Sequence, residues 1–572
     1  MGLFAERKME LFKTDTTQET PNDSKTSDWN RINWDAVTRQ VRTLQTRIVK
    51  AMKQGKMKQV RSLQRLLTHS TAAKLLAVRR VTSNRGKRTA GIDGILWKTP
   101  EAKYAAAMRL SAKGYSAKPL RRVYIPKGGG KTRMLGIPTM YDRAMQALYR
   151  LALDPIAEHT ADTHSYGFRP CRSVADAIAQ CFTVLCHRGS ARYILEGDIQ
   201  RCFDEISHPW LEAHIPLDTK VLREWLRSGA FEGGVVLDTM EGTPQGGIIS
   251  PTLCNMTLDG IDRLLEEHFR RRGKTWRRRH KVNFVRYADD FIITGATKEI
   301  LEHEVMPVLK AFLAERGLRL SEKKTRITDI SDGFHFLGFH LRKYHGKLLI
   351  RPSGASVKKV MTHIRYLIKK HKTMEAGKLI DLLNPVIRGW AYAYRHVVSS
   401  QTFQALDSQI WACLWKWARR RHRHKSASWL KAKYFRQGNG TCWCFSDGKG
   451  TYLYRMSSLS IRRHMKIKGE CNPYDPAWEI YLEQLRERRL PECLQSIEWL
   501  KLYLRQDGQC PYCGGSMEDA IDTDEVDMLC VHHVVPLSQG GKDTLRNKML
   551  LHDVCHRQLH ARHEEEALLV AA

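Results

Sequence analysis

The chain has 572 residues, which is too long for one compact domain and fits about three or four folded units of roughly 150 residues each. Its 42% hydrophobic content excludes a wholly disordered chain, and no apolar run reaches the roughly 20 residues that a membrane span requires. Lys and Arg number 95 against 60 Asp and Glu, so the formal net charge is +35. This excess predicts a polyanionic partner, with a merely soluble basic protein as the alternative.

The beginning of the sequence and its cysteines bear on the compartment. Met1 to Thr17 contains acids and has no apolar run long enough for a signal peptide. The 14 cysteines are few for this length and mostly stand singly among apolar residues, which favours a reducing compartment over a disulfide framework. We therefore expect a cytoplasmic protein with no membrane partner.

The first two segments differ sharply in composition. Residues 1–30 are rich in Thr, Asp, Ser and Asn, and we expect a disordered tail there. From Trp34 to about Val81, apolar residues recur at three- and four-residue steps among Lys and Arg. This periodicity predicts a basic helical extension over 31–85, with one helix face in the core and the other against RNA.

The segment 86–345 alternates short β-branched or aromatic runs with helical stretches, which predicts a large α+β domain. Within it, the apolar residues between Lys298 and Gly317 follow a helical period. Thr297 is placed to cap the start of this helix and Gly317 to end it. We expect the helix to pack on a sheet.

The last three segments are helical, irregular and metal-binding in character. Residues 346–436 are helical and very basic, which predicts a separate nucleic-acid-binding helical domain. Glycines and prolines punctuate 437–495, which we expect to be short irregular structure serving as a DNA-binding region and linker. Clustered Cys and His then mark 496–572 as a terminal domain.

Paired acids within 282–294 give the clearest local signal. Two apolar strand-like runs there are separated by Asp289 and Asp290, which predicts a β-hairpin with carboxylates at its tip. Another strand-like run begins at Tyr193 and ends at Asp198. Three carboxylates on adjacent strand ends suit two Mg²⁺ ions, as in polymerases, because this ion prefers oxygen ligands. Acids of an ordinary turn are the alternative.

Further motifs accompany these acids, whose hairpin tip reads Tyr287-Ala-Asp-Asp290 (YADD). They are Leu135-Gly-Ile-Pro138, Tyr166-Gly-Phe-Arg-Pro170, Gly242-Thr-Pro-Gln-Gly-Gly-Ile-Ile-Ser-Pro251 and Phe334-His-Phe-Leu-Gly-Phe339. The YADD tip and these motifs occur in the order found in reverse transcriptases, and together they resemble the reverse transcriptases encoded by group II introns, over nearly the whole chain from about Trp34. The resemblance implies a right-hand polymerase, with fingers and an antiparallel palm sheet in 86–345 and an α-helical thumb or maturase (X) domain in 346–436.

Carried over to this sequence, the resemblance makes Asp198 and Asp289 the main Mg²⁺ ligands, with Asp290 beside them. It also places Phe203 at the sugar-discriminating position, where an aromatic ring would exclude a ribose 2′-hydroxyl. Deoxynucleotides are therefore the expected substrates. A core aromatic without this role is the alternative for Phe203.

The resemblance assigns further residues to the incoming nucleotide. Lys127 and Arg133 flank the glycines 128–130 in a basic loop that would lie over the triphosphate. Gln245, in the Pro-Gln-Gly turn, would touch the nucleotide. Lys324 would lie close to the primer or the phosphates, and a solvated lysine is the alternative there.

Bases and aromatics alternate in the basic helical segment, a mixture that suits base stacking and phosphate pairing. Trp411 and Trp415, four residues apart, are expected to form a core stripe, with RNA stacking as the alternative. The resemblance implies that this segment holds folded intron RNA during splicing. The arginines that we assign to RNA or DNA are Arg388, Arg419, Arg420, Arg421 and Arg423.

Two knuckles near the end of the chain predict a structural Zn²⁺ site. Cys510 and Cys513 form one, and His552 and Cys555 form the other. Three thiolates and one imidazole can close a tetrahedral site. Such an ion would hold together a segment too small to bury a large core unaided.

The stretch between and after the knuckles resembles the HNH nuclease motif, which implies a small zinc-stapled ββα-metal domain. The resemblance makes His533 the general base, and it makes Asn547 the residue that orients its loop. His532, His556 and His560 would hold one catalytic divalent ion, Mg²⁺ or another. Many HNH modules have Asp where His532 stands. A zinc-stapled DNA-binding knob without cleavage is the alternative.

The resemblance as a whole implies a multifunctional protein that is reverse transcriptase, splicing maturase and HNH DNA endonuclease. Its expected partners are group II intron RNA, target DNA and deoxynucleoside triphosphates, in a bacterial cytoplasm or, alternatively, an organelle. Two other functions stay open: a non-catalytic splicing maturase, and a reverse transcriptase recruited to defence or diversification.

Overall fold

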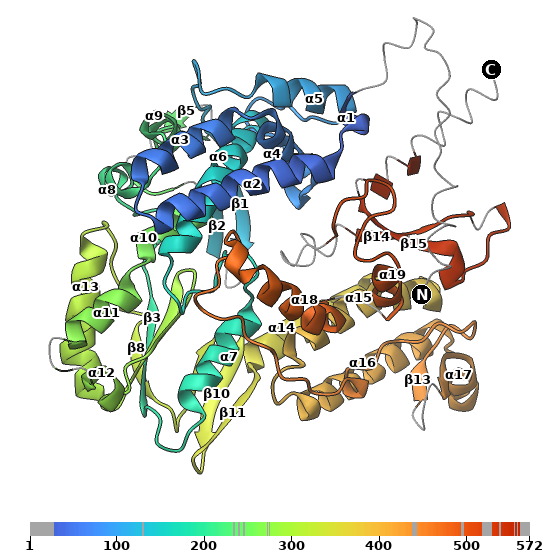
Figure 1. Cartoon of the computed structure of the whole chain (residues 1–572). Coiled ribbons are helices and arrows are strands. Elements are labelled where there is room, and N and C mark those ends of the chain that lie inside the picture. Colours follow the sequence, from blue (N-terminus) through green and yellow to red (C-terminus); the bar gives the residue numbers. More distant parts are fainter. Residues whose placement is uncertain are drawn as a thin grey trace, which may run out of the picture.

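The structure is a computed structural model of the chain (Figure 1). It describes residues 28–560 except 128–130, 233–234, 238–240, 244–245, 271–272, 274, 438–442, 494–496, 518–528, 537–538, 554 and 557–558. The tail expected at 1–30 lies almost entirely outside the described residues. Among the described helices, none is both long enough and apolar enough to cross a membrane.

The predicted basic helices of the N-terminal extension are confirmed. The side chain of Asn33 accepts a hydrogen bond from Ala36 N and so caps α2, and Ser70 caps α4 in the same way. Val41, Ile48 and other apolar residues of these helices are buried in one cluster that includes α6. The helices are α1 (Asp28–Arg31), α2 (Trp34–Lys53), α3 (Met57–His69), α4 (Thr71–Ser83), η2 (Arg85–Arg88) and α5 (Pro100–Arg109).

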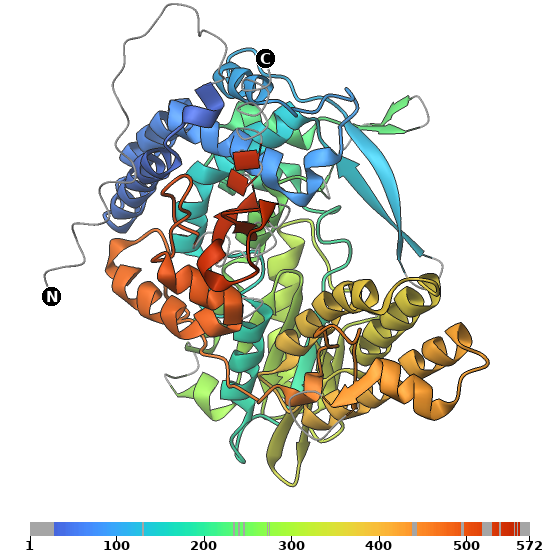
Figure 2. The same cartoon turned by 90° about the vertical axis from the view of Figure 1, so that its right-hand side faces the viewer.

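The fingers carry a four-stranded sheet in the order β2-β1-β4-β5. Its strands are β1 (Leu120–Lys127), β2 (Lys131–Ile137), β4 (Ala230–Glu232) and β5 (Val235–Leu237). β1 and β2 form the long antiparallel hairpin at the right of Figure 2. Helix α6 (Met140–Thr160) follows, and the Thr139 hydroxyl accepts a hydrogen bond from Asp142 N at 3.1 Å to begin it.

The predicted antiparallel palm sheet is confirmed, with the strand order β6-β7-β3-β8. Alternate residues of one strand enter different clusters: Phe291 and Ile293 face one core and Ile292 the other. Both faces of the sheet are therefore buried, as the near-continuous apolar runs of its strands require. The strands are β3 (Tyr193–Asp198), β6 (Phe284–Tyr287), β7 (Asp290–Gly295) and β8 (Arg326–Asp329).

Helices surround this sheet, and the one predicted between Lys298 and Gly317 is confirmed in two parts. The Thr297 hydroxyl accepts from Ile300 N at 3.4 Å, and Gly317 adopts a φ of +74°. The first part, η3 (Ile300–Val305), is a π-helical turn, because Pro307 supplies no N–H to continue a regular α ladder. The others are α7 (Val174–Leu185), α8 (His208–His214), α9 (Thr219–Leu226), α10 (Ser250–Leu258), α11 (Ile261–Arg270), α12 (Trp276–Arg279) and α13 (Met306–Ala314).

The basic helical domain follows a three-stranded antiparallel sheet in the order β11-β10-β9. These strands are β9 (Phe334–Phe336), β10 (Phe339–Tyr344) and β11 (Lys347–Pro352). The helices pack through one apolar cluster that is continuous with the outer face of the palm. They are α14 (Gly354–Lys370), α15 (Ala376–Tyr394), α16 (Ser400–Arg421) and α17 (Ala427–Tyr434).

The prediction of short irregular structure over 437–495 holds for the described residues up to Trp478 and is wrong for 479–493, which are helical. After the hairpin of β12 (Phe435–Gln437) and β13 (Trp443–Phe445) and two 3₁₀ turns, η4 (Met456–Ser458) and η5 (Pro476–Trp478), the chain forms the 15-residue helix α18 (Glu479–Cys493). The stretch before it crosses the polymerase domain, where Arg172 donates to Cys471 O at 2.8 Å. The glycines and prolines of this segment predicted irregular structure, but local composition cannot reveal long-range contacts.

The terminal domain is small and has its own core around Leu502 and Leu550. Its elements are α19 (Ile497–Arg505), β14 (Leu529–His533), η8 (Leu545–Asn547) and β15 (Lys548–His552), with helical residues following at 553, 555–556 and 559–560. β14 and β15 pair antiparallel, so the described residues contain the expected ββα arrangement. Lys87 of η2 and Asp553 form an ion pair at 3.5 Å, which joins this domain to the N-terminal extension.

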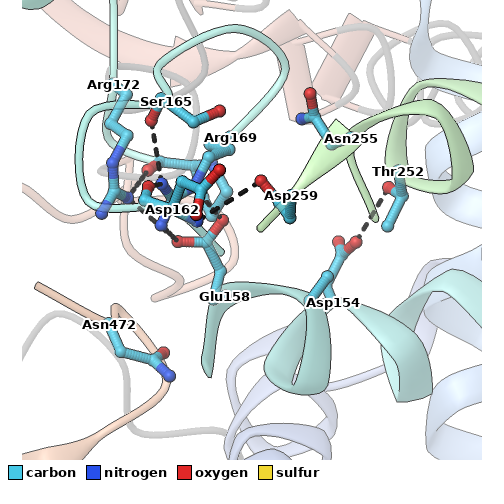
Figure 3. Close-up of polar contacts among 12 residues, drawn as sticks. Asp154, Glu158, Asp162, Ser165, Arg169, Arg172, Thr252, Asn255, Asp259 and Asn472 are labelled. Atoms are coloured by element: carbon cyan, nitrogen blue, oxygen red, sulfur yellow. Dashed lines mark hydrogen bonds and ion pairs between the residues drawn. The ribbon is translucent and has the colours of Figure 1, made fainter. Parts of the chain in front are cut away.

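A buried ion network holds the loop between α6 and α7. Arg169 makes two hydrogen bonds of 2.9 Å to the carboxylate of Glu158, and Arg172 makes a third, also at 2.9 Å (Figure 3). The two arginines hold the pKa of Glu158 below its usual value despite its burial. The carboxylate of Asp176, at the start of α7, likewise pairs with His464 of the stretch that crosses this domain and with Arg489 of α18. Charge pairing therefore stabilises the contact that sequence composition missed.

Arg286 of β6 is fully buried behind the turn that carries the paired acids. Its guanidinium donates to Asn255 Oδ1 at 3.0 Å and to Ala288 O at 3.3 Å, and it forms an ion pair with Asp259. Ala288 has a φ of +57°, so this bond fixes the strained residue of the turn. The turn also packs so closely on Gly167 that a Cβ there would lie 2.4 Å from Ala288 N.

Replacing Arg286 with alanine should lower the local stability of the palm by about 3–5 kcal/mol, because it leaves the buried carboxylate of Asp259 without its partner. Amide hydrogen exchange of β6 and β7 measures this loss. Arg192→Ala, which removes an exposed ion pair with Asp329, serves as the control and should leave the exchange unchanged. Equal protection in the Arg286 variant would show that the turn does not depend on this side chain.

Candidate polymerase and nuclease sites

Strand register brings the predicted polymerase acids together. Asp198, the last residue of β3, pairs directly with Asp290, the first residue of β7. Asp289 lies in the turn immediately before it. Gly197 is required next to Asp198, because a Cβ there would meet the ring of Phe291 at 2.0 Å. All three carboxylates therefore lie at one edge of the palm sheet.

A lysine ammonium already lies against these acids. Lys324 Nζ contacts both carboxylate oxygens of Asp198, at 3.0 and 2.9 Å. A bridge between Ile199 and Leu320, together with the hydrogen bond from Ser321 N to Asp198 O at 2.8 Å, brings the lysine to this position. The ammonium shows that the site attracts a cation.

Asp290 shows how crowded the negative charge is. Its side chain is exposed at the start of β7, whereas the residues that follow it in the strand are buried. Desolvation, followed by the charges of Asp289 and Asp198, raises the pKa of Asp290 to about 6, and Lys324 offsets only part of this effect. A divalent cation would relieve this repulsion, so the three carboxylates fit the Mg²⁺ that the sequence predicts.

Phe203 lies near the acids in the loop after β3. It is half-buried, and its ring packs edge-on against Phe168, with the centroids 6.4 Å apart. Its carbonyl accepts a hydrogen bond from Thr243 N at 2.6 Å, which ties the loop to the predicted nucleotide-binding turn. Gln245 of that turn lies outside the described residues. So do the side chains of Lys127 and Arg133, whose backbones lie in β1 and β2.

The tryptophan stripe of α16 differs from the prediction. Trp411 is 38% exposed and stacks on Trp415 with centroids 5.3 Å apart and rings 9° from parallel, so the two do not form a buried core stripe. Phe435 supports both rings from one side. Trp417 is the buried member, since it lies on the face of α16 that packs against the apolar cluster.

The arginines assigned to nucleic acid occupy two environments. Arg419, Arg420 and Arg423 are exposed near the end of α16. Arg421 is also exposed, but its guanidinium donates to Thr373 O at 2.9 Å and to Met374 O at 2.7 Å. Arg388 lies over the ring of Tyr454, 5.1 Å from its centroid.

The four predicted zinc ligands converge in the terminal domain. Ligand atoms of Cys510, Cys513, His552 and Cys555 all lie within 4.8 Å of one another. His552 Nδ1 lies 3.5 Å from the Cys513 sulfur, and its Nε2 lies 3.1 Å from Ser516 O. A hydrogen bond from Nε2 would hold the ring with Nδ1 free to bind a metal. The donor set and its geometry fit Zn²⁺.

The histidines of the nuclease motif form a second cluster. His532, His556 and His560 place their ligand atoms within 4.8 Å of one another, which fits one divalent ion. His533 points elsewhere, because successive residues of β14 face opposite sides. Its Nε2 lies 3.0 Å from Asp543 Oδ1.

Asp543 is a further candidate site residue that the sequence does not signal. Its carboxylate contacts both His533 and Lys548. These two hydrogen bonds hold the pKa of Asp543 below its usual value. Asp543 lies ten residues after His533 in the sequence, and only the fold of the intervening loop brings its carboxylate next to the imidazole. The sequence alone therefore could not indicate this contact.

Asn547 clamps that loop. Its side chain accepts from Val535 N at 2.8 Å and donates to Val535 O and Lys542 O, each at 2.9 Å. A Cβ on Gly541 would lie 2.0 Å from Val535 O, so only glycine fits under the clamp. This geometry agrees with the orienting role expected for Asn547.

Four family models match consecutive parts of the chain. The N-terminal domain of reverse transcriptase matches 29–110, and the reverse transcriptase (RNA-dependent DNA polymerase) matches 125–341. The group II intron, maturase-specific domain matches 357–435. The HNH endonuclease matches 510–562.

Three curated relatives agree with these matches. Protein YkfC of Escherichia coli is 34% identical over 50% of this chain and 86% of its own length. The group II intron-encoded protein LtrA of Lactococcus lactis is 31% identical over 49% of this chain, and the match spans 58% of LtrA. An uncharacterized 91 kDa protein in the cob intron of Schizosaccharomyces pombe is 24% identical over 85% of this chain and 68% of its own length. The chain therefore belongs to the group II intron-encoded proteins and combines a reverse transcriptase, a maturase-specific domain and an HNH endonuclease domain in one polypeptide.

Proposed function

We propose that the protein copies RNA into DNA at the palm, assists splicing of its intron RNA and cleaves DNA at the terminal domain. The observation that carries the polymerase is the cross-strand pair of Asp198 and Asp290, with Asp289 in the adjoining turn and an ammonium already beside Asp198. A splicing protein without catalysis has no need for three crowded carboxylates, whose mutual repulsion destabilises the fold.

In this proposal Asp198 and Asp289 are the principal Mg²⁺ ligands and Asp290 assists them. Two such ions, when bound, favour attack by the primer 3′-hydroxyl and stabilise the leaving pyrophosphate. Lys324 would release Asp198 when the carboxylates take up their cation, and its ammonium would then be available to a phosphate. Phe203 would meet the sugar, while Lys127, Arg133 and Gln245 would hold the triphosphate.

The nuclease proposal assigns the proton transfer to His533. Its Nε2 and the Asp543 carboxylate share a hydrogen bond, which would orient the imidazole and stabilise it once it has accepted a proton from water. Asn547 holds the loop between them. A divalent ion on His532, His556 and His560 would, when bound, neutralise charge on the scissile phosphate.

The proposed partners follow from these sites. Intron RNA would bind the basic thumb, with the exposed ring of Trp411, stacked on the half-buried Trp415, as a stacking surface. The phosphate contacts would be Arg388, Arg419, Arg420, Arg421 and Arg423. The ribonucleoprotein would then enter a DNA target. One strand would be nicked, and its 3′ end would be extended along the intron RNA.

Primer extension on an RNA template with Mg²⁺ tests the polymerase. The double variant Asp289→Ala, Asp290→Ala should reduce synthesis by roughly 10²- to 10³-fold or more, because it removes the groups that neutralise the reacting phosphates. Asp332→Ala, which removes an exposed acid of the same domain, should be as active as the wild type. Synthesis that persists in the double variant would remove these acids from the mechanism. A folded but inactive wild type would favour the splicing maturase.

Metal analysis tests the zinc site. The wild type should hold one tightly bound zinc per chain at Cys510, Cys513, His552 and Cys555, and Cys510→Ser should lose it. Chelation or this substitution should expose the terminal domain to proteolysis, since a structural ion contributes directly to folding. Cys530→Ser, a half-buried cysteine outside the cluster, is the control. Unchanged zinc content in Cys510→Ser would exclude this ligand set.

Nicking of duplex DNA tests the nuclease. His533→Ala should slow nicking about 10²- to 10⁴-fold, as expected for loss of a general base, and Asp543→Asn should cause a smaller loss. His345→Ala, in the turn between β10 and β11, is the control. Normal nicking by His533→Ala would refute the base role. Binding of the same DNA without cleavage by the wild type would indicate a DNA-binding knob.

A further inference from the structure

A cavity of about 540 Å³ lies away from both sites, where three separate parts of the chain meet. The start of α7, the end of α15 and helix α18 form its walls, so it exists only because the stretch after the thumb returns to the palm. Leu337 and Phe339 of the motif at 334–339 reach its wall, but neither catalytic site uses them.

The lining of this cavity is strongly basic. It includes Arg172, Arg395, Arg486 and Arg489, and no acid lies among the described residues of its walls. Two of these arginines are neutralised from behind: Glu158 pairs with Arg172 at 2.9 Å, as Figure 3 shows, and Asp176 pairs with Arg489 at 2.5 Å.

Arg395 differs from these paired arginines. The residue is only 6% exposed, and its Nε is buried without a hydrogen-bond partner. Within the described part of the chain, its guanidinium forms no hydrogen bond or ion pair, and it lies over the ring of Tyr392, 5.0 Å from the centroid. A buried charge without a counterion is strongly unfavourable. An anion from outside the chain would therefore stabilise the buried charge of Arg395.

The rest of the cavity supports an anion that also carries an apolar group. Other residues of its wall are apolar, with Phe339, Leu482 and Leu485 among them. A phosphate next to an aromatic base matches this combination.

We propose that this cavity binds an unpaired nucleotide of an RNA strand, with a phosphate on Arg395 and the base against Phe339, Leu482 and Leu485. The strand, rather than a free nucleotide, is favoured by the surface beside the cavity. Arg462 N donates to Arg395 O at 3.2 Å, and the side chains of Arg462 and Arg463 are exposed there. These charges would meet the phosphates on either side of the bound nucleotide.

The inference depends on the proposed RNA binding for its source of phosphate, but not on either catalytic site. The probe is a labelled 12-nucleotide uridine oligonucleotide that carries one photoreactive 4-thiouridine, added to the full-length protein. Affinity is measured over a range of salt concentrations, and the cross-linked peptides are mapped. Primer extension is followed in parallel, so that an inactive polymerase is distinguished from an empty cavity.

Arg395→Met is the decisive variant, because methionine keeps the length of the side chain and removes its buried charge. It should lower the affinity for the oligonucleotide about tenfold and remove the cross-link to the cavity peptides. The slope of log affinity against log salt concentration should fall by about one, the value for one lost phosphate contact. Its melting temperature without RNA should equal or exceed that of the wild type. Leu485→Trp, which fills the cavity and keeps the charge, should also remove the cross-link. Arg192→Met on the palm should change none of these values.

Three results would overturn the proposal. One is a cross-link that persists in both cavity variants. Another is a lower melting temperature of free Arg395→Met with unchanged affinity, which would give the arginine a purely structural role. The third is loss of the cavity cross-link when uridine monophosphate is added at the same concentration as the oligonucleotide, which would assign the cavity to a free nucleotide.

Discussion

The buried contact between Arg286 and the YADD turn is the interaction on which the polymerase site depends. The guanidinium holds Ala288 O from one side and Asp259 from the other, so the turn is anchored to α10 and its C-terminal end. Asn255 links the same arginine to Gly167 O, through hydrogen bonds of 3.0 and 2.7 Å. The buried guanidinium of Arg286 therefore positions both the loop at 166–170 and the YADD turn. The carboxylates are held close together by the fold itself.

This rigidity has an electrostatic cost, because it fixes three acids at one sheet edge. The raised pKa of Asp290 records that cost, and the ammonium of Lys324 offsets part of it. A site built in this way favours the binding of a strongly charged cation. The zinc cluster differs from the polymerase site, because its ligands come from two knuckles that are distant in the sequence. The ion itself would mainly hold these ligands together.

The sequence was sufficient wherever chemistry coincides with a local pattern. The hairpin that carries Asp289 follows from the two apolar strand-like runs on either side of the paired acids, and the run that ends at Asp198 is readable as another strand. The zinc knuckles were equally readable. The sequence was insufficient where a residue acts through a distant partner: Arg286 resembled any strand arginine, and Asp543 any loop acid. The spacing of Trp411 and Trp415 misled, because four residues separate neighbours on any helix face, exposed or buried.

The return of the chain over the palm is the largest feature that composition concealed, and it explains how the terminal domain is positioned. Asp176 receives Ile467 N at 2.8 Å together with His464 and Arg489, while Lys53 pairs with Asp475 of the same stretch. The stretch that was expected to be a loose linker is thus bound to both the N-terminal extension and the palm. Lys87 then contacts Asp553 near the zinc cluster. Under the proposed function, such contacts would keep the nuclease and the polymerase close to the same DNA end.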